Sequence, residues 1–160
     1  ITATVGVAKG TLYYHFSSKE EIFNFLVEEG MKLLKNSIQI KTAKLDNSID
    51  KIKAIILIQV KVLKKYENLI TIVLSQIWGT EERNTTCRRY VMDYIKTVEK
   101  IIKEGIEKQE IIDMDSEVLA SEIFASTCTS LIYKMKTNQE IDIKKMYTEL
   151  ETSVIKGIKR

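Results

Sequence analysis

The residues best suited to chemistry gather near the start of the chain, where Lys9, Thr11, Tyr13 and Tyr14 follow one another with little apolar content beyond Leu12. A short helix that is basic, polar and aromatic is unusual in a packed core. It suits a helix laid in the major groove of DNA, where Lys and Thr reach base edges and phosphates while Tyr hydroxyls reach the backbone. The composition of this segment therefore indicates a surface that contacts DNA.

The elements that would position these side chains are two short helices joined by a tight bend. Residues 1–5 read as the end of one helix, and a second short helix is expected from about residue 7 to residue 14. Gly6 lies between them and can adopt the positive φ that such a bend requires. The pattern predicts the second half of a helix-turn-helix unit.

The run from Gly6 to Ile22, GVAKGTLYYHFSSKEEI, closely resembles the recognition-helix signature of the TetR (tetracycline-repressor-like) family of bacterial transcriptional regulators. The usual pattern of that family is G-V-S-x-x-T-L-Y-x-[HY]-F-x-[SN]-K-E-x-[LI]. The resemblance implies a homodimeric repressor released from a palindromic operator by a small, largely hydrophobic ligand. The residues that it assigns to the DNA-facing surface are Lys9, Gly10, Thr11, Tyr13, Tyr14, His15 and Lys19.

The N-terminal residues depart from the family pattern at Ala8, at Thr2 and Val5, where the family prefers Ala, and in their extent. Ala8 stands where the family usually has a Ser that caps the recognition helix, a change worth about 0.5–2 kcal/mol. The first helix of the family and most of its second should precede Ile1, so we expect an N-terminally truncated DNA-binding domain. Residues 1–40 are then a partial helix-turn-helix domain with its connecting helix, and residues 41–160 a ligand-binding and dimerisation domain.

The rest of the chain predicts long helices with few connections. Its 160 residues include no proline and six glycines, and 44% of them are hydrophobic. Apolar residues recur at helical spacing almost everywhere from Ser18 onward, and a Ser18–Glu21 capping box opens the first of these helices. Asp115 is expected to cap a later helix, and Gly105 to act as a helix terminator or as a close-packing site. We therefore predict an all-α fold whose body is a bundle of about six helices.

Several aromatic and polar side chains could line a ligand cavity or could simply belong to the core. Their helical spacing alone favours the core. The family resemblance favours the cavity, because regulatory domains of that family commonly enclose a small-molecule pocket between their central helices. The candidate pocket residues are Gln59, Trp78, Tyr90, Tyr94 and Phe124.

The last two predicted helices also allow two interpretations. The segment from residue 116 to 135 is rich in small residues and could form a hairpin packed on the body with the final helix. Alternatively, both helices pair with those of a second subunit in a four-helix bundle. The candidate interface residues are Ala125, Ser126, Thr129, Ile132, Leu150 and Val154.

Other functions find little support in the sequence. Cys87 and Cys128 lie among apolar helical positions, which predicts buried, reduced thiols, and His15 is the single histidine. We therefore expect no metal site, no cofactor and no enzymatic activity. The net charge of +3 is compatible with binding DNA but does not argue for it.

Without a signal peptide or a long apolar run, a cytoplasmic location is expected. The alternative function is a helical small-molecule or lipid-binding protein with a vestigial DNA-binding module.

Overall fold

The computed structural model describes residues 16–77 and 85–159, and every element named in these ranges is an α-helix. This confirms the predicted all-α fold and its six helices. Within the described ranges, a single antiparallel bridge between Ile111 and Lys159 is the one β-type contact. The helices are α3 (Lys19–Thr42), α4 (Ser48–Lys65), α5 (Glu67–Ile77), α6 (Thr85–Glu107), α7 (Ser116–Lys136) and α8 (Ile143–Ile158).

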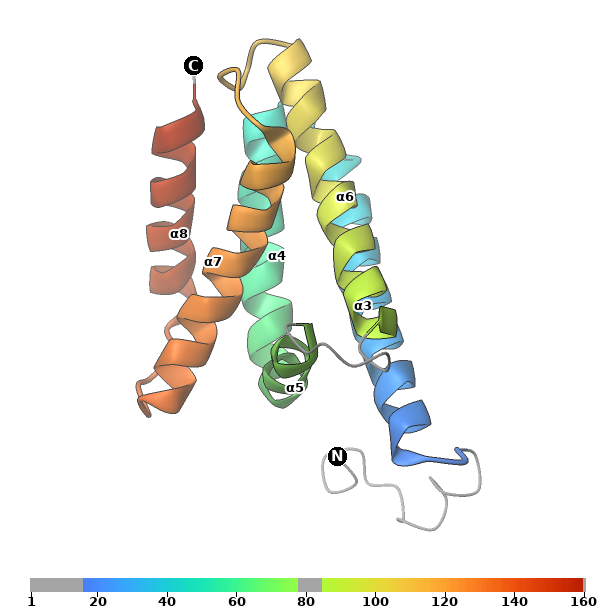
Figure 1. The fold of residues 1–160 in the computed structure, drawn as a ribbon. Helices are drawn as coiled ribbons and strands as arrows, with labels where there is room; N and C mark the ends of the chain where they lie inside the picture. Colours follow the sequence, from blue (N-terminus) through green and yellow to red (C-terminus); the bar gives the residue numbers. More distant parts are fainter. Residues whose placement is uncertain (1–15, 78–84, 160) are drawn as a thin grey trace.

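α4 is the central helix, and it contacts each of the other five (Figure 1). Its sequence explains this central position because the helix is apolar on nearly every side. Ile52, Ile55, Ile56 and Val60 are all almost completely buried, and Ile58 packs against the same core from the edge. A helix of this kind must be surrounded by other elements to remove its surface from water.

α3 and α6 are the two longest helices and run beside each other along one side of the bundle (Figure 1). α3 buries Met31, Leu34 and Ile38, whose spacing of three and four residues places them on one face. At the surface, the Lys35 ammonium lies 2.6 Å from the Asp93 carboxylate of α6. α3 is therefore held in the body mainly by its apolar stripe, because an exposed ion pair contributes little.

The helix starts follow the predicted capping residues. Ser18 Oγ accepts the Glu21 backbone N–H at 3.1 Å, and Asp115 caps α7. Asn47 caps α4, where its side chain accepts two backbone N–H groups of the first turn. The return half of the predicted box differs, because the Glu21 carboxylate accepts the backbone N–H of Ser17 at 2.7 Å instead of that of Ser18. The carboxylate thus ties the residue before the cap to the helix.

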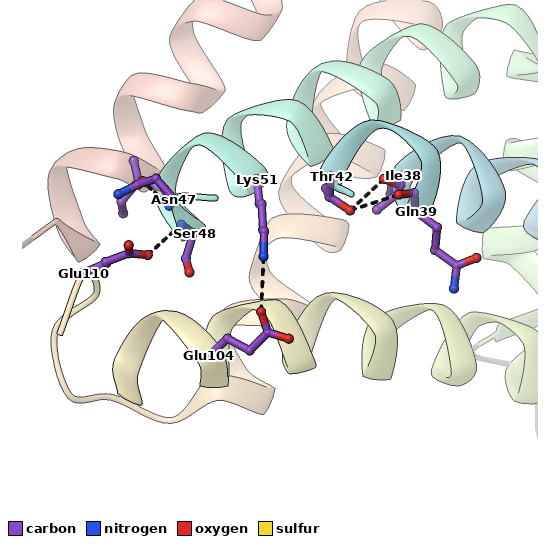
Figure 2. Close-up of polar contacts among 9 residues, drawn as sticks. Ile38, Gln39, Thr42, Asn47, Ser48, Lys51, Glu104 and Glu110 are labelled. Atoms are coloured by element: carbon purple, nitrogen blue, oxygen red, sulfur yellow. Dashed lines mark hydrogen bonds and ion pairs between the residues drawn. The ribbon is translucent and has the colours of Figure 1, made fainter. Parts of the chain in front are cut away.

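The beginning of α4, the end of α6 and the loop after α6 meet at one corner of the bundle (Figure 2). The Glu110 carboxylate accepts the Ser48 backbone N–H at 2.6 Å, and this hydrogen bond lowers the pKa of Glu110. Lys51 of α4 lies 3.2 Å from the Glu104 carboxylate of α6. These contacts fix the α6–α7 connection against the central helix.

Gly105 acts as a close-packing site at this corner. α6 continues to Glu107, so the glycine does not terminate it. The chain turns instead at Gln109, whose φ of 59° lies in the left-handed region. The backbone N–H of the next residue, Glu110, donates to the Gly105 carbonyl oxygen. A Cβ on Gly105 would lie 2.5 Å from Ile111 Cδ1 and 2.8 Å from Ser48 Cβ. Only a residue without a side chain lets α6 approach α4 this closely.

Substituting Gly105 of α6 and Gly157 of α8, whose surroundings differ, should change stability in opposite directions. Gly105→Ala should destabilise the protein by about 1–3 kcal/mol, because the new methyl group overpacks the corner. Gly157→Ala meets nothing within 4 Å and should stabilise α8 by up to about 1 kcal/mol through its higher helix propensity. Urea unfolding followed by circular dichroism measures both, and equal shifts for the two variants would contradict the packing argument.

Candidate functional site

The DNA-facing surface predicted from the sequence lies mostly outside the described residues. This holds for Lys9, Gly10, Thr11, Tyr13, Tyr14 and His15. Lys19 is described, and it is exposed on the first turn of α3 beside the Ser18 cap. The free backbone N–H groups and the helix dipole add partial positive charge at this end. Glu20 and Glu21 occupy the same turn as Lys19.

Two aromatic rings connect the segment before α3 to the helix. The ring centroids of Phe16 and Phe25 lie 5.3 Å apart in a tilted arrangement. Phe16 belongs to the run from Gly6 to Ile22 that carries the TetR resemblance. Its contact with α3 gives that segment a direct mechanical connection to the helix that enters the body.

The structure brings three of the predicted pocket residues together in the core between α4, α6 and α7. Gln59 Nε2 donates to the Tyr94 hydroxyl at 2.6 Å, and the Tyr94 and Phe124 rings lie 5.4 Å apart. Gln59 and Tyr94 are at most 1% exposed. Tyr90 lies apart from them, partly buried, where its hydroxyl bonds the Glu28 side chain of α3. Trp78 lies outside the described residues.

Thr127 completes this buried polar cluster, and the sequence reasoning missed it. Its Oγ1 lies 3.0 Å from Gln59 Oε1 and 2.9 Å from the Ile123 carbonyl oxygen. In the sequence, Thr127 is one of many small residues in its segment. The available signal was the helical spacing of Thr127 from Ile123 and Phe124, which places it on the buried face.

The surroundings of the cluster keep its ionisable neighbours neutral. Burial raises the pKa of Tyr94, and it raises the pKa of the adjacent Cys128 to about 12. Cys87 and Cys128 are both free and buried, as predicted. We call Gln59, Tyr94 and Thr127 the core triad. It offers uncharged hydrogen-bonding groups inside an apolar interior.

An apolar cleft lies between α3, α4 and α5, one helical turn along α4 from the core triad. Its volume is about 30 Å³, close to the volume of one water molecule and far below the roughly 300–1,000 Å³ of occupied ligand pockets. The described residues thus show a closed apolar site. Its lining residues are Val27, Gly30, Met31, Leu34, Val62, Leu63, Tyr66, Ile70 and Val73.

The residues predicted for a subunit interface lie on α7 and α8 with different exposures. Ala125 and Thr129 are exposed, and Val154 is buried within the chain. Ser126, Ile132 and Leu150 are partly buried. Val118 and Tyr133 lie on the face of α7 that carries Ala125 and Thr129. These two large hydrophobic side chains are 57% and 64% exposed. A groove of about 470 Å³ runs between the end of α7 and α8, beside Tyr133.

Comparisons with known proteins agree on the family. Residues 1–26 match the family of bacterial regulatory proteins described as the tetR family. A Clostridium perfringens protein assigned to the regulation of fatty acid metabolism is 33% identical and superposes with a TM-score of 0.87 over 98% of this chain and 85% of its own. The chain therefore belongs to the TetR family, and it is a DNA-binding transcriptional regulator.

Two further solved structures share the fold at lower identity. The transcriptional regulator FadR from Bacillus subtilis, in complex with stearoyl-CoA, is 21% identical, with a TM-score of 0.83 over 98% of this chain and 85% of its own. The fatty acid degradation regulator FadR from Bacillus halodurans is 18% identical, with a TM-score of 0.82 over 96% and 84%. No curated protein sequence matches the chain. None of the helices in the described ranges is long and apolar enough to cross a bilayer.

Proposed function

We propose that this protein is a homodimeric repressor released from its operator by a long-chain fatty acyl ligand. The observation that carries the proposal is the 33% identity, over nearly the whole chain, with a protein assigned to the regulation of fatty acid metabolism. The stearoyl-CoA bound to the B. subtilis regulator suggests the chemical form of the ligand. As a regulator of this kind the protein has no catalytic role, and it acts in the bacterial cytoplasm, where operator DNA lies.

The apolar cleft and the core triad together suit a long apolar chain with an uncharged polar group. The cleft offers apolar contact, and the triad one turn away offers neutral hydrogen-bonding groups. A buried ion would need a charged partner in such a place. A fatty acyl thioester is neutral at its carbonyl and meets this requirement.

The position of the cleft also couples ligand binding to DNA binding. Val27, Met31 and Leu34 of α3 form one of its walls, and α3 carries the DNA-facing segment at its N-terminal end. A ligand that needs several hundred cubic ångströms has to enlarge the cleft, and in our proposal it does so by moving α3 away from α4 and α5. It favours the open arrangement only through its higher affinity for that arrangement, and the same free energy lowers the affinity for DNA.

We divide the chain as the sequence suggested, into a partial DNA-binding domain over residues 1–40 and a ligand-binding and dimerisation domain over residues 41–160. The boundary falls in the last turn of α3, which ends at Thr42. α3 thus belongs to both units. This continuity supports the proposed coupling between ligand binding and DNA binding, because one helix extends from the DNA-binding domain to the cleft.

The dimer forms through α7 and α8. Ala125 and Thr129 permit close approach of a second helix, while Val118 and Tyr133 offer exposed apolar surface at either end of the same face. A two-fold axis near Ala125 would pair the Val118 end of one α7 with the Tyr133 end of the other. Light scattering should give the mass of two chains, and a monomer at micromolar concentration would refute this arrangement.

The ligand test measures operator affinity by fluorescence anisotropy, with full-length protein and an operator selected from random DNA. Saturating stearoyl-CoA should raise the Kd by about 5- to 150-fold, the usual range of allosteric coupling, while coenzyme A alone should not. Binding of stearoyl-CoA without any change in the Kd would contradict the proposal. The absence of salt-dependent DNA binding in any condition would favour the vestigial-module alternative.

The contact proposed for Lys19 is tested in the same assay. Lys19→Ala should weaken binding similarly on all DNA sequences and reduce the slope of log K against log salt by about 2, because each of the two subunits loses one phosphate contact. Lys156→Ala removes the same charge from an exposed position on α8 and should leave the slope unchanged. An unchanged slope in Lys19→Ala would remove Lys19 from the DNA interface.

A further inference from the structure

The core triad holds more hydrogen-bond donors than its surroundings can use. The Tyr94 hydroxyl, the Thr127 hydroxyl and the two amide protons of Gln59 are four donor protons. Three contacts connect them: Gln59 to Tyr94 at 2.6 Å, Thr127 to Gln59 at 3.0 Å, and Thr127 to the Ile123 carbonyl oxygen at 2.9 Å. Each contact uses one proton, so at least one donor proton has no acceptor among the described residues.

This surplus does not depend on how the Gln59 amide is oriented. With Nε2 toward Tyr94, Thr127 has one proton for two acceptors, and both the Tyr94 O–H and the second Gln59 N–H are left over. With the amide oxygen and nitrogen exchanged, Tyr94 donates to Gln59, Gln59 to Thr127 and Thr127 to Ile123. One Gln59 N–H is then still left over.

A leftover donor is costly in this place. Gln59 is fully buried, and Tyr94 and Thr127 are each 1% exposed, so bulk water does not reach them. A buried polar group without a partner costs about 1–3 kcal/mol, and proteins rarely retain one without a reason. The core triad therefore calls for an acceptor from outside the described residues.

The acceptor has to be uncharged. Among the described residues, the influences on the Tyr94 pKa are burial, the Gln59 hydrogen bond and Cys128, and none of these is a cation. A carboxylate would be buried here without a positive partner, which is strongly unfavourable. A carbonyl oxygen accepts a hydrogen bond without bringing a charge.

We propose that the core triad binds the thioester carbonyl oxygen of the fatty acyl ligand through the spare protons of Gln59 and Tyr94. The inference rests on the proposed function. Leu63 lines the apolar cleft and lies one helical turn from Gln59 on α4, so the alkyl chain reaches the cleft while its carbonyl lies at the triad. The triad thereby distinguishes an acyl thioester from a hydrocarbon chain of the same length.

The test compares stearoyl-CoA with S-octadecyl-CoA, a thioether that lacks the carbonyl, by titration calorimetry on full-length protein. Wild-type protein should bind the thioester about 5- to 10-fold more tightly, the value of one buried hydrogen bond. In the double variant Gln59→Met/Tyr94→Phe the ratio should fall to about 1. This variant removes every spare donor and leaves Thr127 bonded to Ile123.

Thr42→Val is the matched control. Thr42 is also a buried threonine whose hydroxyl donates to the carbonyl oxygen four residues earlier, that of Ile38 (Figure 2), but it lies at the end of α3 and makes no hydrogen bond to the triad. The wild-type ratio should persist in this variant. Circular dichroism establishes that each variant is folded, and the ratio of two affinities does not depend on the active fraction.

Each other outcome overturns the inference in a recognisable way. If wild-type protein binds both ligands equally, or the double variant keeps the preference, the triad does not bind the carbonyl, and a buried water satisfies its donors instead. If neither ligand binds, the proposed fatty acyl ligand fails as well. Should the double variant not fold, infrared spectra of carbonyl-¹³C stearoyl-CoA on wild-type protein decide: an unshifted carbonyl band would refute the hydrogen bond.

Discussion

The enclosure of α4 by the five other described helices is the constraint on which the rest of the structure depends. Its isoleucines and valines leave almost no side that could face water, so the other helices have to cover it. At about 25 cal/mol per Å² of buried apolar surface, this enclosure is the main favourable contribution to the fold. Any movement of a neighbouring helix therefore changes the packing of α4.

This arrangement explains why one helix can connect a ligand with DNA. α3 lies on α4 through its apolar stripe and continues to the segment that carries the TetR signature. The cleft between α3, α4 and α5 is closed in this structure, so a ligand there competes with packing instead of filling an existing space. At the end of α4 away from the cleft, Gly105 and Glu110 fix α6 and its loop on the beginning of α4.

Much of the fold could be predicted because its signals are local. Helical spacing predicted the six helices, and Ser18 and Asp115 indicated the starts of α3 and α7, because capping depends on residues two or three positions apart. The signature near the N-terminus indicated the family for the same reason. The burial of Cys87 and Cys128 also followed from their helical faces.

The features that were not predicted depend on contacts distant in sequence or on irregular backbone. Thr127 meets Gln59 across 68 positions, and no pattern within α7 identifies that partner. The left-handed turns after α6 and α7 are made by Gln109 and Asn138, so the glycine signal for a helix end was missing. Gly105 had two possible roles until the distance to Ile111 decided between them.

The most direct measurement for the central claim is the distance between α3 and α4 with and without ligand. Spin labels on full-length Glu20→Cys/Lys61→Cys, both at exposed positions, report this distance by pulsed electron paramagnetic resonance, since the native cysteines are buried. Stearoyl-CoA should shift the distance distribution, and coenzyme A alone should not. An unchanged distribution under conditions where stearoyl-CoA binds and operator DNA dissociates would contradict the account.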